Sequence, residues 1–331
     1  MSFRAPSLAQ TLFVVALFVA LTLPLFASAY YLQFASKVLI TGVLAMGLNL
    51  AVGQGGMVSL CHGAFFGVAG YILALATPGY DAAPLLATLP LAVLGSAGLA
   101  FLIGCFALRT RGVYFILVTL AFGEMLFYLF HDSGIAGGSD GAFINARPDI
   151  LIAGRQWLNL DKPLVFYCVM LALTAAVAGL LAMLVRSPFG HALAAVRDNE
   201  RRARSLGFPI FRIRLSAFVI SGGLAGLAGY FAAAQFGFVA PQMLSWHVSA
   251  AALVMVLIGG LRSVTGPLIG ALVLTGLEEV LKAEFENWKL IEGLIVILLV
   301  IVLPGGLRQL GLLTTWAPRK EVAPASGAGR A

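Results

Sequence analysis

The sequence predicts an all-α protein, a polytopic transmembrane bundle of about ten helices with N- and C-termini cytoplasmic. Hydrophobic residues make up 60% of the 331 residues and charged residues only 11%, whereas a soluble domain carries roughly 25% charged residues. Apolar runs recur along the chain at lengths close to the roughly 20 residues that cross a bilayer. The basic residues gather between these runs. Together these observations indicate a membrane protein.

The predicted spans follow one another with mostly short connections. The first, Leu8–Ala29, is either a retained helix or a signal peptide, because Ala27-Ser28-Ala29 resembles a cleavage site; its length and the next span close behind favour a retained helix. The other spans are predicted at Phe34–Val52, a third ending near Ala76, Pro84–Leu108, Gly112–Phe130, Pro163–Val185, Leu215–Phe238, Val248–Ile258, Pro267–Leu281 and Leu290–Leu303. The membrane domain thus covers residues 1–316, and the Pro-, Ala- and Gly-rich tail 317–331 is predicted to be disordered and cytoplasmic.

The densely charged segment Arg186–Arg214 fixes the orientation of the bundle. It reads RSPFGHALAAVRDNERRARSLGFPIFRIR and holds seven of the 21 lysine and arginine residues. Clustered arginine between two spans is retained in the cytoplasm during insertion. The Gly-rich loop 131–162 then lies outside. Because the basic residues stand at span ends, as orientation signals do, nucleic-acid binding is not predicted.

The same segment carries the signals of two short helices. Ser187-Pro188 offers a cap and a proline at the first helical position. Leu193 and Val196 then fall on one face. Asn199-Glu200 can begin a second helix, which Gly207 ends in the left-handed conformation. Such a segment is either a surface that another protein binds or a solvated loop that only sets topology, and the residues leave both readings open.

Two glycine-broken segments interrupt the apolar runs. They are Gly53–Gly67 (GQGGMVSLCHGAFFG) and Gly259–Gly270 (GGLRSVTGPLIG), and each ends in a Gly-x-x-x-Gly pair. Irregular backbone at membrane depth indicates a water-lined cavity or a transport path, whereas small residues at this spacing are also typical of close helix packing. Both readings stay open here. The Gly222, Gly226, Gly229 series is predicted to be a close-packing face.

Five polar residues in or beside the spans are candidates for lining a path: Asn49, Gln54, Ser59, His62 and Glu124. Glu124 stands midway along the fifth predicted span, where a carboxylate is costly and is either functional or paired. The chain has no P-loop and no zinc-binding helix, and Ser59 and His62 lack the partners of a nucleophilic site. No catalytic residue, metal site or cofactor is therefore predicted.

Six blocks between about Gly47 and Leu310 resemble a known family and stand in its order. They are GLNLAVGQGGMVSLCHGAFFGVAGY, RGVYFILVTLAFGEM, GIAGGSDG, SPFGHALAAVRDNERRARSLG, RLSAFVISGGLAGLAGYFAA and VLIGGLRSVTGPLIGALVLTGLEEVL. Together they resemble the permease subunits of branched-chain amino acid ABC importers, of the LivM type. Each block alone is a weak signal, and the set is a specific one.

The resemblance implies a multi-pass permease of a bacterial inner membrane that forms the path for a branched-chain or related small amino acid. The implied partners are a second homologous permease, two ATP-binding cassette subunits that hydrolyse the ATP, a periplasmic substrate-binding protein and membrane lipid. The chain itself is then a transport subunit and no enzyme. A leucine-like amino acid, urea or an amide is a substrate that such relatives serve.

In such importers a cytoplasmic loop docks on the ATPase and transmits its closure. The resemblance places this coupling loop at residues 186–214, and its assigned residues are Ser187, Pro188, Gly190, Arg197, Asn199, Glu200, Arg201, Arg202 and Gly207. Two positions depart from the family pattern: Arg201-Arg202-Ala203 replaces an acidic-Ala-Ala start, and Gly260-Leu261-Arg262 replaces small residues.

Two other functions are weighed against the importer subunit. A stand-alone secondary transporter of a small polar solute needs buried carboxylates for coupling ions, and the sequence analysis identifies no matched set of them. An intramembrane enzyme needs a catalytic constellation, which the residues do not supply. Uptake by the purified chain without any ATPase would favour the secondary transporter.

Overall fold

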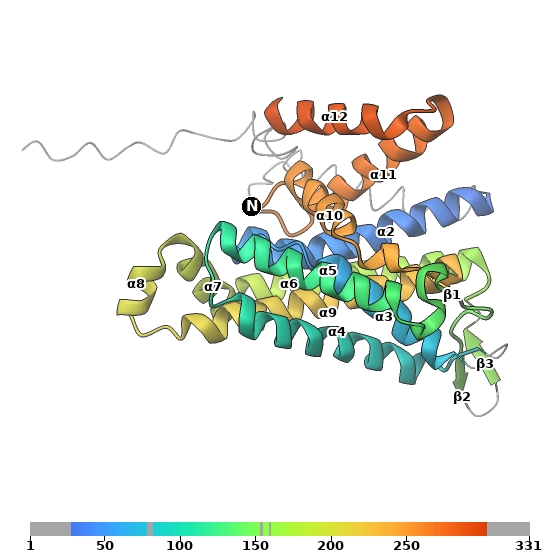
Figure 1. Ribbon diagram of the computed structural model, residues 1–331, viewed down its shortest axis with the longest axis horizontal. Coiled ribbons are helices and arrows are strands. Elements are labelled where there is room, and N and C mark those ends of the chain that lie inside the picture. The colour runs from blue at the N-terminus through green and yellow to red at the C-terminus, as the bar shows by residue number, and fades with distance from the viewer. Residues whose placement is uncertain (1–27, 78–81, 153–154, 159, 303–331) are drawn as a thin grey trace, which may run out of the picture.

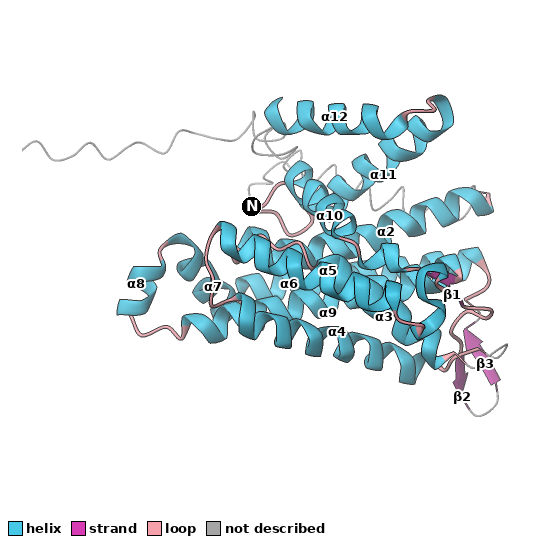
Figure 2. Cartoon of the chain, in the orientation of Figure 1, coloured by secondary structure: helices cyan, strands magenta, loops and turns pink. Residues whose placement is uncertain are grey.

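The computed structural model describes residues 28–77, 82–152, 155–158 and 160–302, which form a bundle of helices with four short strands (Figures 1 and 2). The helices that match predicted spans are α2 (Ala29–Asn49), α3 (His62–Ala76), α4 (Leu85–Ala107), α5 (Val113–Asp132), α6 (Pro163–Arg186), α9 (Ile210–Phe236), α10 (Trp246–Gly259), α11 (Gly266–Glu284) and α12 (Trp288–Val302). The connections contain the π-helical turn η1 (Leu50–Gln54), the 3₁₀ turns η2 (Ile135–Asp140) and η3 (Pro241–Leu244), the short helices α7 (Pro188–Asp198) and α8 (Glu200–Ser205), and the strands β1 (Ala142–Phe143), β2 (Ile150–Ile152), β3 (Arg155–Leu158) and β4 (Phe238–Val239). The predicted all-α class is confirmed.

Five of the described helices are long and apolar enough to cross a membrane: α2 continued by η1, α4, α5, α6 and α9. The apolar helices α3 and α10 are shorter, with 15 and 14 residues. Residues 8–27 of the first predicted span and the predicted tail 317–331 lie outside the described residues. A polytopic helical protein is thus supported, while ten spans with cytoplasmic termini stay a prediction.

Two helices form the centre of the bundle. The apolar windows of α2 and α9 are each 83% buried, against 28% for α4, 17% for α5 and 22% for α6. Large apolar side chains such as Leu94, Leu117 and Met183 are exposed on those three outer helices. In a membrane protein, lipid covers such side chains. The candidate residue Asn49, at the end of α2, therefore lies inside the subunit.

The glycines of α9 allow its neighbours to approach closely. A Cβ added at Gly229 would lie 1.8 Å from the carbonyl oxygen of Phe66 on α3, and one added at Gly226 would lie 2.3 Å from Oγ of Ser96 on α4. No side chain fits at these positions, so helix backbones touch where small residues stand. The predicted close-packing face of α9 is confirmed.

The basic loop and the loop predicted to be external lie at opposite ends of the bundle. Figure 1 shows α7 and α8 projecting from one end, and the strands at the other. β1 pairs with β4 in antiparallel fashion through Ala142 and Val239, and β2 pairs with β3 through Ile152 and Arg155. This separation is what the predicted orientation requires.

Candidate functional site

The basic loop folds as the two short helices that its sequence predicts. The Ser187 hydroxyl accepts a hydrogen bond from the backbone N–H three residues on (3.4 Å), and Pro188 begins α7. Oδ1 of Asn199 accepts from the backbone N–H of Arg202 (3.0 Å) at the start of α8. Gly207 follows α8 with a φ of +82°, the left-handed conformation predicted for it.

The helix α7 packs against the bundle. The side chains of Leu193 and Val196, its predicted apolar face, are fully buried, and such burial contributes about 1.5–3 kcal/mol per aliphatic side chain. A Cβ added at Gly190 would lie 2.2 Å from the carbonyl oxygen of Val185, so glycine is needed where α7 turns back on α6. The loop is therefore attached to the membrane helices, which favours a built surface over a purely solvated loop.

Glu200, the first residue of α8, joins the loop to two long helices. Its carboxylate pairs with Arg111 before α5 (2.7 Å), with Arg214 near the start of α9 (3.1 Å) and with Arg204 on α8 itself (3.0 Å). The Glu200 side chain is 19% exposed and that of Arg214 20%, so this pair is largely shielded from solvent, whereas Arg111 and Arg204 are 67% and 66% exposed. From the sequence, Glu200 is predicted as a helix start and as a coupling-loop residue, but not as an ion-pair partner, because no local pattern signals pairing between distant segments.

The outward side of the loop presents charge beside apolar surface. Arg201 and Arg202 are exposed, and their guanidinium groups form no ion pair within the described part of the chain. Leu206 is 69% exposed and Phe208 37% exposed, next to α8 at the projecting end of the bundle (Figure 1). A pocket where α8 meets the turn before α5 is lined by Arg111, Asp198, Asn199, Glu200, Arg201 and Arg204. Arginine beside exposed apolar side chains is typical of a protein-binding surface.

The two glycine-broken segments meet at one place. Asn49, the last residue of α2, donates from Nδ2 to the carbonyl oxygen of Ser263 in the α10–α11 turn (2.7 Å). A Cβ added at Gly53 in η1 would lie 1.9 Å from the carbonyl oxygen of Leu261 in the same turn. Arg197 of α7 donates from Nη1 to the Gly53 carbonyl oxygen (2.7 Å). We call these five residues, Asn49, Gly53, Arg197, Leu261 and Ser263, the inner junction.

Between η1 and α3 the chain is irregular, and protein hydroxyls satisfy its backbone. The N–H of Leu60 donates to the hydroxyl of Thr119, more than one turn inside α5 (3.2 Å). The N–H of Gly63, at the start of α3, donates to the hydroxyl of Ser249 on α10 (2.7 Å). Irregular backbone at membrane depth needs such partners. The first break is therefore closed by internal packing in this conformation.

His62 links three helices through two consecutive hydrogen bonds. Its Nε2 lies 2.6 Å from the Ser221 hydroxyl on α9, and that hydroxyl donates to the Gly47 carbonyl oxygen on α2 (2.6 Å). Because the one hydroxyl proton of Ser221 is donated to the Gly47 carbonyl oxygen, Ser221 can only accept from His62. The Nε2 of His62 is therefore protonated and donates to the Ser221 hydroxyl oxygen. Ser59 is buried as well, and its hydroxyl lies 3.2 Å from Sγ of Cys61.

The five path candidates fall into two groups. Asn49, Ser59 and His62 are fully buried, and each forms a hydrogen bond inside the subunit, while Oδ1 of Asn49 and Nδ1 of His62 have no partner among the described residues. Gln54 and Glu124 are half-buried, and Oε1 of Glu124 has no hydrogen-bond partner among the described residues. The five lie on the end of α2 with η1, on the segment that begins α3, and on α5. Which of them line a path stays a prediction.

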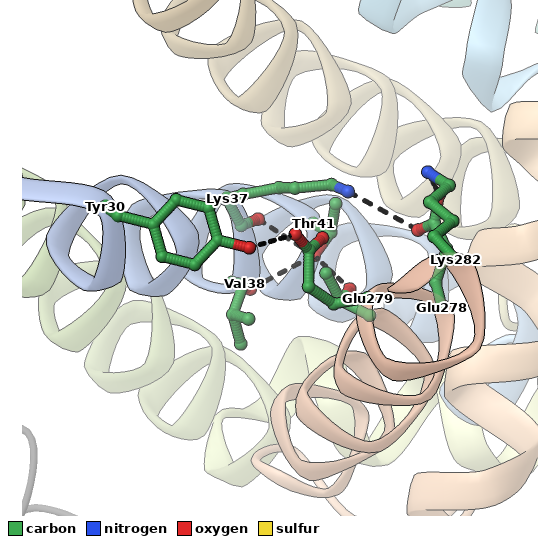
Figure 3. Close-up of polar contacts among 8 residues, drawn as sticks. Tyr30, Lys37, Val38, Thr41, Glu278, Glu279 and Lys282 are labelled. Atoms are coloured by element: carbon green, nitrogen blue, oxygen red, sulfur yellow. Dashed lines mark hydrogen bonds and ion pairs between the residues drawn. The ribbon is translucent and has the colours of Figure 1, made fainter. Parts of the chain in front are cut away.

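A second set of polar contacts joins α2 to α11 (Figure 3). Nζ of Lys37 lies 3.4 Å from Oε2 of Glu278, whose Oε1 lies 2.5 Å from Nζ of Lys282. The Tyr30 hydroxyl donates to Glu279. We call these five residues the outer seam. Sequence analysis does not identify it, although lysine in one predicted span and glutamate in another are residue types that pair inside membranes.

Comparison with known proteins places these features in a family context. Residues 30–303 match the family described as branched-chain amino acid transport system / permease component. The chain is 33% identical over 318 residues to the high-affinity branched-chain amino acid transport system permease protein LivM of Salmonella typhimurium. The aligned region covers 90% of this chain and 75% of that protein. LivM of Escherichia coli strain K12 matches with the same identity and coverage.

A more distant match covers part of the chain. The autoinducer 2 import system permease protein LsrC of Photorhabdus laumondii is 34% identical over 180 residues, 51% of this chain and 52% of that protein. No solved structure matches the chain.

Proposed function

The chain belongs to the family of permease components of branched-chain amino acid transport systems, and we propose that it works as the membrane-spanning subunit of an ABC importer. In this role it forms the path for a branched-chain or related small amino acid, and a separate chain hydrolyses the ATP. LivM covers 90% of this chain and LsrC 51%. The broader match favours an amino acid over an autoinducer as the substrate.

The proposed assembly is a heterodimer with a second homologous permease, two ATP-binding cassette subunits and a periplasmic substrate-binding protein. The chain crosses a bacterial inner membrane with about ten spans and both termini in the cytoplasm. The placement of α7 and α8 at one end, and of the strands at the other, supports this orientation. The absence of a P-loop from the sequence supports ATP hydrolysis by a partner.

The coupling loop carries the proposal. Its outer side offers Arg201, Arg202 and the exposed Leu206, which suit a protein partner. Its inner side is fixed to the bundle by the ion pairs of Glu200 and by the bond of Arg197 to η1. A solvated loop that only sets topology needs neither the exposed binding surface nor the fixed inner side. The loop is thus suited to bind a partner on its outer side and to transmit the partner's movement to the membrane helices.

We propose different roles for the two groups of path candidates. Gln54 and Glu124, half-buried in this conformation, face the path. Asn49, Ser59 and His62 hold the broken segments in place from inside the subunit and do not face the path in this conformation. This division follows from burial, because the packing around Asn49, Ser59 and His62 leaves no exposed group for a solute in this conformation.

The proposal is tested with the double variant Arg201→Glu/Arg202→Glu in proteoliposomes that contain the full complex. Charge reversal at the docking surface should uncouple ATP hydrolysis from uptake, and uptake should fall roughly tenfold or more. The variant should insert into the membrane normally. Arg212→Glu, an exposed change on the same loop, is the matched control.

Two results would contradict the proposal. One is normal uptake by the double variant in an intact complex, since the loop would then not dock on the ATPase. The other is uptake by the purified wild-type chain alone, without any ATPase, since that is the behaviour of a secondary transporter. Co-purification of a P-loop ATPase and a second permease with the tagged chain is the supporting result.

A further inference from the structure

Arg197 reaches from the coupling loop into the inner junction with an oriented side chain. Its Nε and Nη2 both lie 2.9 Å from Oδ1 of the neighbouring Asp198, and its Nη1 donates to the Gly53 carbonyl oxygen at 2.7 Å. The Arg197 side chain is 21% exposed, against 64% for Asp198. Because a guanidinium is a rigid planar fork, the Asp198 contact fixes the direction of the bond to Gly53.

The Gly53 carbonyl is available because η1 ends at Gln54, the next residue. In a regular α-helix the N–H of Met57 would donate to this oxygen. Here the N–H of Met57 donates to Ala51 (2.9 Å) and the N–H of Gly55 donates to Leu50 (3.1 Å). A carbonyl in the last turn of a helix has no donor within the helix and needs a partner outside it. Arg197 is that partner.

The other side of Gly53 is fixed to the second broken segment. An added Cβ would lie 1.9 Å from the Leu261 carbonyl oxygen and 2.2 Å from Oδ1 of Asn49. Motion of Gly53 toward the α10–α11 turn is therefore blocked by backbone. Separation is opposed by the bond from Asn49 to the Ser263 carbonyl oxygen. At this packing density the two broken segments can only move together.

The stem of Arg197 also packs on the first broken segment. Gly56 has a φ of +68°, and a Cβ added there would lie 2.8 Å from Cγ of Arg197. Contact is thus made by the methylene stem on Gly56 and by the guanidinium on Gly53. Lysine at position 197 would keep the charge and the stem, but it would lose the planar fork.

We propose that Arg197 is the positioning residue through which the coupling loop moves both glycine-broken segments. The inference rests on the proposed function, because it requires an ATPase that moves the loop. It adds the path of the movement: from α7 through the Gly53 carbonyl to η1, and from η1 to the α10–α11 turn through the backbone contact with Leu261 and the bond to Ser263.

The test compares Arg197→Ala, Arg197→Lys and Arg212→Ala in the complete complex in proteoliposomes. Arg212 is an exposed arginine in the first turn of α9, outside α7 and α8, and it forms no ion pair in the described part of the chain. Co-purification, ATP hydrolysis and uptake per ATP hydrolysed are measured for each. Arg197→Ala should assemble and hydrolyse ATP, with uptake per ATP reduced roughly tenfold. Arg197→Lys should recover part of the loss, and Arg212→Ala should match wild type.

Each other outcome decides against the inference or against its premise. Unchanged uptake per ATP in an assembled Arg197→Ala complex overturns the inference. Failure of Arg197→Ala to co-purify with its partners overturns it too, because Arg197 would then be an assembly contact. A wild-type complex without ATP-dependent uptake instead refutes the proposed function, so the two failures are distinct.

Discussion

The inner junction and the outer seam both hold α2 against the α10–α11 unit, but they do so with different groups. At the inner junction the contact is between backbones, with Gly53 directly on the Leu261 carbonyl. At the outer seam it is between the ends of flexible side chains, as in the 3.4 Å pair of Lys37 and Glu278 (Figure 3). Backbone positions are fixed by the helices that carry them, whereas Lys and Glu side chains can separate and pair again.

The difference suggests how one helix pair can serve a transport cycle. A displacement that starts at the coupling loop shifts the inner ends of α2 and α11 together, because nothing at Gly53 can yield. Their outer ends can separate by breaking ion pairs that cost little. The account therefore expects large effects from small changes at the inner junction, and small effects from larger changes at the outer seam.

The largest effect is expected from adding one methyl group at the inner junction. Gly53→Ala places a Cβ against the Leu261 carbonyl and should lower the free energy of unfolding by about 3 kcal/mol. Gly98→Ala on α4 is the matched control, since a Cβ there meets nothing within 4 Å. Alanine is the better helix former, so this variant should be neutral or more stable by up to about 1 kcal/mol. Thermal unfolding in detergent measures both, and equal stability of the two variants would refute the close contact.

The next effect compares one hydrogen bond at each end. Asn49→Ala removes the 2.7 Å bond to Ser263 from a fully buried site and should cost about 2 kcal/mol. Thr41→Val removes a 3.5 Å contact with Thr275 beside the outer seam and should cost less than about 0.5 kcal/mol. Reversible unfolding in mixed micelles gives both values. A larger loss for Thr41→Val would reverse the comparison.

The smallest effect is expected within the outer seam itself. Glu278→Gln leaves Lys37 and Lys282 without their shared carboxylate and should cost about 1 kcal/mol, whereas Lys37→Met leaves the 2.5 Å pair of Glu278 with Lys282 intact and should cost about half as much. Both losses should shrink as salt is raised, because the side chains are 26–40% exposed. Unfolding at two ionic strengths measures this. Losses that ignore salt would mean that the seam is shielded from solvent.

The local structure of the coupling loop is predictable from sequence because caps are short-range. Ser187, Asn199 and Gly207 act on backbone groups within a few residues, and all three act as expected. Contacts between distant segments are not predictable in this way. Glu200 pairs with Arg111 and Arg214, and no periodicity in the chain encodes that pairing.

The two glycine breaks show the same limit. Sequence analysis identifies both segments, because glycine and serine interrupt apolar runs. It does not identify their meeting at Gly53 and Ser263, nor the widened turn η1, since a π-type turn leaves no hydrophobic signature. A polar residue in apolar surroundings can line a path or form a buried hydrogen bond such as that of His62, and the sequence does not distinguish the two.

The central claim is that a separate ATPase drives this permease through the loop at residues 186–214. It is tested most directly by cross-linking single cysteines to the ATPase subunit in native membranes. Arg201→Cys, exposed on the loop, should cross-link to the ATPase, and Phe143→Cys, exposed on β1 at the opposite end of the bundle, should not. Cross-linking through position 143 with none through position 201 would contradict the account.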